Sequence, residues 1–317
     1  MLWSIDHGLW TFSYICAKFV YRKLIFDLRT SRYLSYCCLT LLVPMFAIAQ
    51  TDSSRINSDS LQLSSTDTTH APTDSITPTD SIIRYRINRT YLKSIVEDLG
   101  YTVSRPAHWH KKDFTRLGVV FGVTGGLMLA DYEIKRAFQL NQTKFLNSVA
   151  HEIEPFGNAY APYLVLGMYA VGVVTKNRNL EHASLMTTKS LLISTLLNTA
   201  TKVIIRRERP AYTDNVANYD PPFTGDRQHT SFPSGHMLTV TTVATALAEI
   251  YGEDHPWVPW VAYSVAGLTG LSRLYHNRHW SSDVWIGASL GYFVTKSVFR
   301  HQRQRSKRGT YNLQVVP

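Results

Sequence analysis

The stretch PSGHMLTVTTVATALAEIY, from Pro233 to Tyr251, begins with a Ser-Gly turn and continues as an apolar run without the alternation of a strand. A run of this length predicts a helix, and its opening glycine lets the backbone come close to a ligand. The first backbone N–H groups of a helix are unpaired and lie at the positive end of its dipole. We therefore expect an anion to bind at the first turn, beside Ser234, Gly235 and His236.

Similar apolar runs recur on both sides of this stretch, separated by Gly, Pro and polar residues, and none alternates with period two. Pro210 should end the third of them, because proline cannot donate a helical hydrogen bond and disfavours helical geometry before it. The sequence predicts an all-α fold, an antiparallel bundle of about six core helices with the active site at one end. The six runs, in chain order, are Leu117–Ala130, Ala159–Val174, Ser184–Ile204, Met237–Tyr251, Trp257–Leu271 and Val284–Phe299. A weaker amphipathic piece, Thr143–Ile153, lies between the first two.

Charged residues mark the ends of the other runs. Lys202 and Arg209 end the third run, Arg273 ends the fifth, and His279 with Asp283 begins the last. In chain order, the four sites therefore lie at the C-terminus of one helix, the N-terminus of the next, the C-terminus of the one after and the N-terminus of the last. Consecutive helices of an antiparallel bundle run in opposite directions, so all four sites meet at one end of the bundle. Seven residues make two helical turns, so Lys202 and Arg209 are expected on one helical face.

The chemistry of these residues predicts an oxyanion pocket. Three fixed cations without a neighbouring cysteine or carboxylate cluster suit a multiply charged tetrahedral anion, and phosphate is the obvious one. A histidine followed four residues later by an aspartate, His279 and Asp283, is typical of a nucleophile with its orienting partner. We found no metal-ligand spacing among the Asp, Glu and His residues, so no metal or other cofactor is expected.

Three coupled segments carry a resemblance to a known family: Lys202-x6-Arg209-Pro210, Pro233-Ser234-Gly235-His236 and Ser272-Arg273-x5-His279-x3-Asp283. They resemble, at every position and in the expected order, the signatures of the type 2 phosphatidic acid phosphatase and vanadium haloperoxidase superfamily. The resemblance covers roughly residues 117–299. It implies a metal-independent hydrolase for phosphate monoesters or diphosphates of membrane lipids, including isoprenoid diphosphates.

The resemblance also implies a role for each matching residue. His279 would take the phosphoryl group as a phosphohistidine, and Asp283 would hold its other ring nitrogen. His236 would protonate the leaving oxygen and later activate water. The phosphoryl oxygens would be bound by Lys202, Arg209, Ser234, Gly235 and Arg273.

Other functions share this pocket chemistry. A vanadate-dependent haloperoxidase would use the same residues, but the chain is compact and short after its last motif, which favours a phosphatase. A phosphatase for soluble phosphomonoesters remains an alternative within the same reaction class. A non-catalytic binding module would need neither a nucleophile nor an acid, so the complete set of motif residues argues against it.

Several residues beside the motifs match no signature position. We interpret Arg206 and Arg207 as solvated side chains or as contacts to lipid head groups. Trp280, next to the candidate nucleophile, is expected to serve packing. The polar, proline-containing segment Ala211–Phe232 lies between two site elements and is expected to face the substrate.

The beginning of the chain is typical of an exported protein. Arg29 and Arg32 precede an apolar run that ends in Ala47-Ile48-Ala49, which predicts a signal peptide or an N-terminal anchor and a location in the periplasm or cell envelope. All three cysteines precede that site. The predicted organisation is a signal or anchor at 1–49, a disordered Ser/Thr/Asp/Pro linker at 50–83, the helical phosphatase domain at 84–300 and a basic tail at 301–317.

The formal net charge of +10 favours an anionic partner. Without a zinc or aromatic nucleic-acid motif, a membrane surface suits it better than nucleic acid. Most apolar runs are shorter than the roughly twenty residues that a bilayer span needs. We therefore expect a domain that lies on or partly in the membrane, with a soluble bundle as the alternative. The oligomeric state is not predicted.

Overall fold

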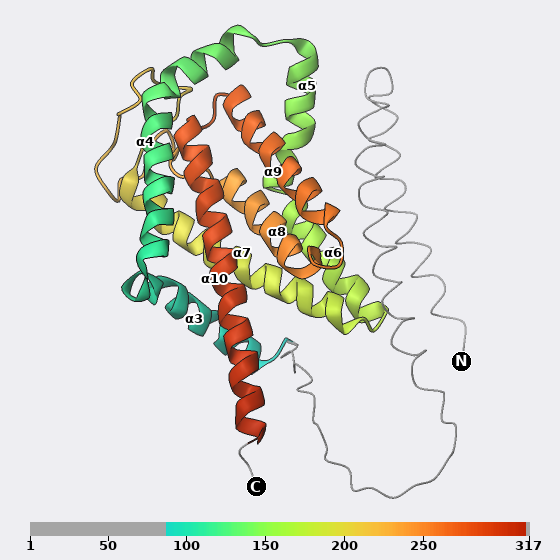
Figure 1. The fold of residues 1–317 in the computed structure, drawn as a ribbon. Coiled ribbons are helices and arrows are strands. Elements are labelled where there is room, and N and C mark those ends of the chain that lie inside the picture. The colour runs from blue at the N-terminus through green and yellow to red at the C-terminus, as the bar shows by residue number, and fades with distance from the viewer. Residues whose placement is uncertain (1–86, 315–317) are drawn as a thin grey trace, which may run out of the picture. The chain divides into compact units, whose positions relative to one another are not determined.

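The computed structural model describes residues 87–314, with side chains described to residue 307, and this part of the chain contains eight α-helices and no β-strand (Figure 1). The predicted all-α class is confirmed. The signal or anchor at 1–49 and the linker at 50–83 lie outside the described residues. The helices are α3 (Arg89–Ser104), α4 (Lys111–Leu140), α5 (Lys144–Ile153), α6 (Tyr160–Val174), α7 (Arg178–Ile205), α8 (Gly235–Tyr251), α9 (Trp257–Tyr275) and α10 (Ser281–Gln314), with short 3-10 turns at Arg105–His108 and Glu154–Gly157.

Helix α8 lies at the centre of the bundle. It packs against α7, α9 and α10, while α4 packs on α10, α5 on α9 and α6 on α7. Its residues from Val240 to Leu247 are buried without interruption. A helix that is enclosed on all sides needs apolar or small residues all round, which explains the Ala- and Thr-rich sequence from which we started.

Two glycines of α10 set its distance from α8. A Cβ atom on Gly287 would lie 2.4 Å from the carbonyl oxygen of Ser234, and one on Gly291 would lie 2.6 Å from that of Leu238. Both distances are below any real Cβ contact, so α10 crosses the beginning of α8 at backbone distance. The Ser234 N–H donates to the carbonyl of Asp283 at 3.0 Å. This crossing holds two signature segments side by side.

Helix α3, which we did not predict, seals the opposite part of the core. Its Asp98 forms a fully buried ion pair with Lys189 of α7 at 2.5 Å, and it also contacts His301 of α10. The hydrophobic cluster between these helices comprises Tyr91, Leu185, Met186, Ile193, Ala246, Val294, Val298 and Phe299.

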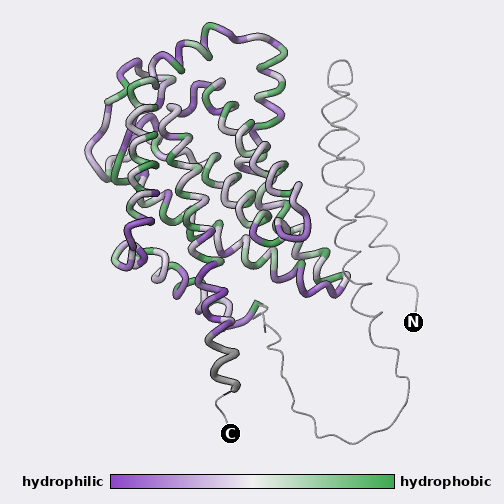
Figure 2. Tube along the Cα trace, viewed as in Figure 1, coloured by the Kyte–Doolittle hydropathy of each residue, from purple (hydrophilic) through white to green (hydrophobic). Residues whose placement is uncertain are grey.

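Two helices extend more than ten residues beyond the predicted runs. Helix α4 extends the predicted run 117–130 to 30 residues, and by length and composition it is the one helix in the described part of the chain that could cross a membrane. Hydrophobic residues recur along the outer helices as well as in the centre (Figure 2), and Leu129 of α4 is 90% exposed. Helix α10 continues to Gln314, so the boundary expected at residue 300 does not fall at a helix end.

Candidate active site

The four signature positions lie at one end of the bundle, as predicted. Figure 1 shows the end of α7, the start of α8, the end of α9 and the start of α10 on the same side, beside the long loop of residues 206–234. Contacts between these segments are direct. The Lys202 Nζ donates to the Thr230 carbonyl at 2.7 Å, and the Arg209 Nη2 donates to the Thr230 hydroxyl at 3.0 Å. The two cations therefore meet beside one residue of the loop.

Lys202 and Arg209 do not share a helical face, and that prediction was wrong. Helix α7 ends at Ile205, because Arg206 adopts a left-handed conformation with φ 51°, four residues before Pro210. Lys202 therefore comes from the last turn of α7, whereas Arg209 comes from the loop. The chain reverses so that both still point to the same pocket.

The pocket contains polar atoms without partners in the described structure. The Nε of Arg209 and the hydroxyl oxygen of Ser234 are buried and make no hydrogen bond. Burial lowers the pKa of Lys202 to about 8, with Arg209 adding to the effect and Asp283 opposing it. Unpaired buried donors and crowded cations are costly unless an anion joins them. The arrangement suits an oxyanion.

A Cβ atom on Gly235 would meet only the Asn198 side chain at 3.5 Å and the Lys202 side chain at 4.0 Å. These are ordinary contacts, so the fold does not need a glycine here. The space that a larger residue would fill lies between the start of α8 and Lys202, where the anion is expected.

His279 is the most enclosed of the site histidines. Its Nδ1 lies 2.7 Å from the carbonyl oxygen of Ser231. A carbonyl only accepts, so Nδ1 carries the hydrogen and Nε2 keeps its lone pair. Burial lowers the pKa of His279 well below its usual value, and Lys202 and Arg209 lower it further. The ring is thus neutral at physiological pH, as a nucleophile must be.

Asp283 does not hold the ring of His279, which corrects the expected role. Its Oδ2 accepts from the Ser231 hydroxyl at 2.5 Å and from the Trp280 N–H at 3.0 Å, and its Oδ1 accepts from Arg207 at 2.7 Å. The physical reason is that Ser231 lies between the two side chains, presenting its carbonyl to His279 and its hydroxyl to Asp283. Asp283 therefore acts on His279 indirectly, through Ser231 and through the backbone of Trp280.

Arg206 and Arg207 were interpreted as solvated, and both are buried instead. Arg207 is 1% exposed and bridges Asp283 and Asp131, which lies on α4 at 2.8 Å from Nη2. Arg206 is 4% exposed and lies 3.4 Å from Asp220. Trp280 is buried and donates from its indole nitrogen to the Glu208 carbonyl, in keeping with the packing role predicted for it.

A second carboxylate at the site, Glu154, comes from the 3-10 turn before α6. It accepts from Arg273 Nη1 at 2.7 Å and lies 3.9 Å from His236 Nε2. The hydrogen bond from Arg273 lowers the pKa of Glu154 to about 2. Burial lowers the pKa of His236 to about 4, with Arg273 lowering it further and Glu154 opposing. Arg273 and His236 therefore share one anionic neighbour.

Sequence reasoning missed Asp131, Ser231 and Glu154. The signal for Asp131 was present, since it is the first carboxylate after an apolar run, where an unpaired charge would be costly. Ser231 and Glu154 carried no comparable signal. They lie outside the signature segments, and only the folded chain brings them to the site.

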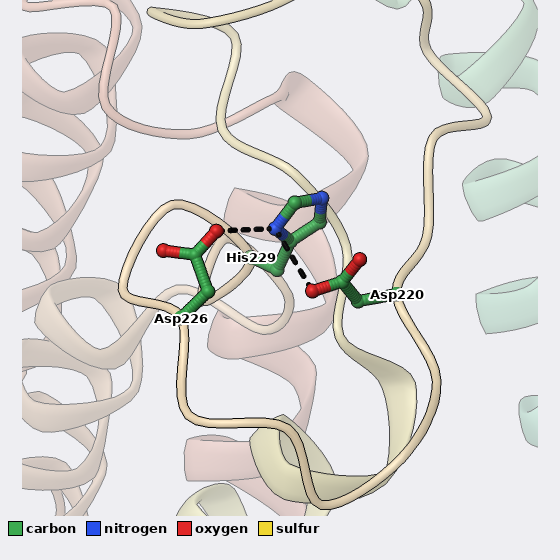
Figure 3. A group of neighbouring side chains, drawn as sticks. All are labelled: Asp220, Asp226 and His229. Atoms are coloured by element: carbon green, nitrogen blue, oxygen red, sulfur yellow. Dashed lines mark hydrogen bonds and ion pairs between the residues drawn. The ribbon is translucent and has the colours of Figure 1, made fainter.

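One group of side chains has the geometry to hold a metal ion. Asp220, Asp226 and His229 of the loop offer ligand atoms within 4.8 Å of one another, and Figure 3 shows the imidazole between the two carboxylates. Spacing in the sequence did not single out this group. Arg206 contacts Asp220 at 3.4 Å and competes there with any cation. None of the three residues belongs to the signature segments.

An apolar cavity of about 360 Å³ lies between α4, α5 and α9. Its lining includes Phe138, Val149, Ile153 and Leu271, and it reaches Ser272. Ser272 directly precedes Arg273, and Ile153 directly precedes Glu154. The cavity is thus lined by the sequence neighbours of Arg273 and Glu154, while these two residues themselves do not line it.

Comparison with known proteins supports the predicted resemblance. Residues 185–307 match the family model of the PAP2 superfamily. A lipid A 1-phosphatase from Porphyromonas gingivalis is 36% identical over 99 residues, which cover 27% of this chain and 22% of that protein. A phosphatidylglycerophosphatase B from Bacillus subtilis is 27% identical over 185 residues, 55% of this chain and 85% of that protein.

A decaprenylphosphoryl-5-phosphoribose phosphatase from Mycolicibacterium smegmatis is 36% identical over 86 residues, 27% of this chain and 42% of that protein. The chain thus matches less than a quarter of the P. gingivalis protein and less than half of the M. smegmatis protein. The matched family region contains every predicted site residue. This match confirms the predicted relationship to the PAP2 superfamily over residues 185–307.

Proposed function

We propose that this chain is a metal-independent phosphatase that hydrolyses phosphate monoesters or diphosphates of membrane lipids through a phosphohistidine on His279. The observation that carries the proposal is the state of His279. Its Nδ1 faces the carbonyl of Ser231 at 2.7 Å, so its Nε2 is unprotonated, beside cations with unpartnered donors. A neutral nucleophile and an incomplete oxyanion pocket meet at one point.

In the first step, His279 Nε2 forms a bond to phosphorus as the bond from phosphorus to the leaving oxygen breaks. The negative charge that gathers on the phosphoryl oxygens is stabilised by fixed donors. His236 gives its proton to the leaving oxygen. The donors for the phosphoryl oxygens are Lys202, Arg209, Arg273, Ser234 and the Gly235 amide.

In the second step, His236 takes a proton from water as the oxygen of that water attacks phosphorus. The nitrogen–phosphorus bond breaks, inorganic phosphate leaves and His279 is restored. The pKa of about 4 at His236 applies to the pocket without its anion. A bound phosphoryl dianion adds negative charge among the cations and raises that pKa, which allows His236 to carry the proton it must donate.

Three observations support a lipid ester as substrate. The relatives named above are called phosphatases of lipid A, phosphatidylglycerophosphate and a decaprenylphosphoryl sugar phosphate. The apolar cavity, lined in part by the sequence neighbours of Arg273 and Glu154, has room for part of a hydrocarbon chain. Helix α4 exposes apolar side chains and is long enough to cross a bilayer. We extend the proposal to an exported, membrane-associated enzyme of the cell envelope.

A substrate panel tests the proposal directly. Purified full-length chain in detergent would be given phosphatidate, phosphatidylglycerophosphate, undecaprenyl diphosphate, lipid A and p-nitrophenyl phosphate, and phosphate release measured with excess EDTA. We expect hydrolysis of at least one lipid, unaffected by EDTA. Loss of turnover on chelation, restored by magnesium, would contradict a metal-independent mechanism.

The cavity allows a separate test of lipid binding. Val149→Trp should fill the space and raise KM for the lipid substrate, while leaving p-nitrophenyl phosphate hydrolysis unchanged. Leu129→Trp is the matched control, because Leu129 is 90% exposed and does not line the cavity. Equal effects of Val149→Trp on both substrates would mean that the cavity holds no part of the lipid.

A further inference from the structure

A chain of buried hydrogen bonds connects His279 to helix α4. Its first link is the carbonyl of Ser231, which accepts from His279 Nδ1. Ser231 is fully buried and is held twice. Its backbone N–H donates to the carbonyl of Arg207 at 3.0 Å, and its hydroxyl donates to Asp283 at 2.5 Å. The position of the carbonyl that sets the tautomer of His279 thus depends on Arg207 and Asp283.

Arg207 is fixed on every side. Its Nη1 donates to Asp283 at 2.7 Å, its Nη2 to Asp131 at 2.8 Å and its Nε to the Val216 carbonyl at 3.0 Å. The guanidinium carbon also lies 5.2 Å from the centre of the Trp280 ring. Burial opposes the charge, but Asp283 and Asp131 raise the pKa of Arg207 above its ordinary value. The guanidinium fork matches two carboxylates at once, which a lysine cannot do.

Asp131 is the last link and the one that α4 contributes. Within the described part of α4, only Thr124 and Asp131 are buried. Besides Arg207, Asp131 accepts from the Ser281 hydroxyl at 2.5 Å, from the Ser282 N–H at 3.0 Å and from the Ser282 hydroxyl at 2.5 Å. It therefore fixes the first turn of α10, two residues after His279, as well as the arginine.

We propose that Asp131 and Arg207 are positioning residues for phosphoryl transfer, which hold the Ser231 carbonyl against Nδ1 of His279 and so keep Nε2 free to attack phosphorus. Neither residue touches the substrate. The inference rests on the proposed role of His279 as nucleophile. It makes α4, the helix that exposes most of its surface, a part of the catalytic machinery through one carboxylate.

The first test is the kinetics of Asp131→Asn. Every partner of Asp131 donates a hydrogen bond to it, and the amide N–H groups of an asparagine cannot accept one. Arg207 and the start of α10 would therefore shift. Displacement of a reacting group by about 1 Å can cost about 10²-fold in rate, so we expect kcat to fall by about ten- to hundredfold. KM should change by less than about twofold, because in the described structure the network makes no hydrogen bond or ion pair with Lys202, Arg209 or Arg273. Thr124→Ala, a buried substitution on the same helix outside the network, should leave both constants unchanged.

A double-mutant cycle tests whether the residues act through one chain. Asp131→Asn and Ser231→Ala remove links at its two ends, and these residues do not contact each other. If both act on His279 through the same contacts, the double variant should lose less than the product of the single losses. Glu154 contacts Arg273 and lies outside this chain of hydrogen bonds. Asp131→Asn combined with Glu154→Gln should therefore lower kcat by the product of the two single losses.

The outcomes separate this inference from the proposed function. A folded Asp131→Asn enzyme with wild-type kcat would overturn the inference, as would multiplicative losses with Ser231→Ala. If thermal melting shows that Asp131→Asn does not fold, Arg207→Lys takes its place, and wild-type kcat there would overturn the inference equally. Activity in His279→Ala, measured in the same assay, would instead remove the proposed function.

Discussion

The Nδ1 atom of His279 lies 2.7 Å from the carbonyl oxygen of Ser231, a residue of the loop between α7 and α8. This contact, rather than one to Asp283, determines which ring nitrogen carries the proton. Asp283 and Arg207 act one step away by holding Ser231. The site therefore behaves as a rigid assembly in which the reactivity of the nucleophile depends on several buried residues.

With p-nitrophenyl phosphate, whose leaving group does not need the proton of His236, the pH dependence should report Lys202 and His279. Lys202 binds the anion only when protonated, and its pKa of about 8 means that kcat/KM should fall as pH rises through about 8. His279 attacks only when neutral, and its pKa lies well below 6.5, so the acid limb should lie below that pH. Lys202→Arg should move the alkaline limb to higher pH, because a guanidinium does not titrate there.

A pH–rate profile of the Lys202→Arg enzyme, compared with that of the wild type, would check whether Lys202 is the group that titrates near pH 8. Lys93→Arg, on the exposed face of α3, is the control that should leave the profile unchanged. An alkaline limb that stays near pH 8 in Lys202→Arg would assign the titration to another group.

Gly235→Ala should separate anion binding from folding. The added methyl group would meet Asn198 and Lys202 at ordinary contact distances, so the melting temperature should stay within a few degrees of wild type. The same methyl group would take up space in the anion pocket, so competitive inhibition by orthovanadate should weaken by at least about tenfold, which corresponds to about 1.4 kcal/mol. Unchanged vanadate inhibition would place the anion elsewhere. Gly287→Ala, which would collide with Ser234 at 2.4 Å, should destabilise the protein instead.

The same sequence-based reasoning succeeded for some parts of the site and failed for others. The gathering of Lys202, His236, Arg273 and His279 could be predicted, because antiparallel helices bring alternate ends together whatever their exact limits. The loop position of Arg209 could not be predicted, because α7 ends early at Arg206, which adopts a left-handed conformation. Helices usually end in this way at a glycine or an asparagine, and the sequence has neither at this position.

The buried network was beyond sequence reasoning for a different reason. Arg207 reaches Asp131 across 76 positions and Ser282 reaches Asp131 across 151. Local patterns carry no information on such pairings, and an arginine in a run of charged residues is usually solvated. Helix α3 was missed because its mean hydropathy is close to neutral, so it did not stand out as an apolar run.

Lys189→Met should test the contribution of the remote ion pair to stability. It would leave Asp98, which is fully buried, without its cationic partner at 2.5 Å. Breaking a buried pair in this way typically costs about 3–5 kcal/mol, so the urea midpoint should fall clearly. Activity per folded molecule should be retained, since the pair lies outside the site. Lys93→Met removes an exposed pair and should change stability by less than about 1 kcal/mol.

His236→Ala should affect substrates unequally. An alkoxide leaving group needs the proton of His236, whereas p-nitrophenolate leaves readily without one. The loss of kcat should therefore be severe for phosphatidate and milder for p-nitrophenyl phosphate. Equal losses would show that His236 binds phosphate without acting as the general acid.

The phosphohistidine on His279 is the central claim, and trapping it is the most direct measurement. Enzyme mixed with radiolabelled phosphatidate would be quenched in alkali within one turnover, digested and examined by mass spectrometry. We predict a base-stable, acid-labile phosphoryl group on the peptide that contains His279, and neither label nor turnover in His279→Ala, whose fold should be intact because the pocket loses no ion pair. Full turnover in His279→Ala, or label on a different residue, would contradict the mechanism.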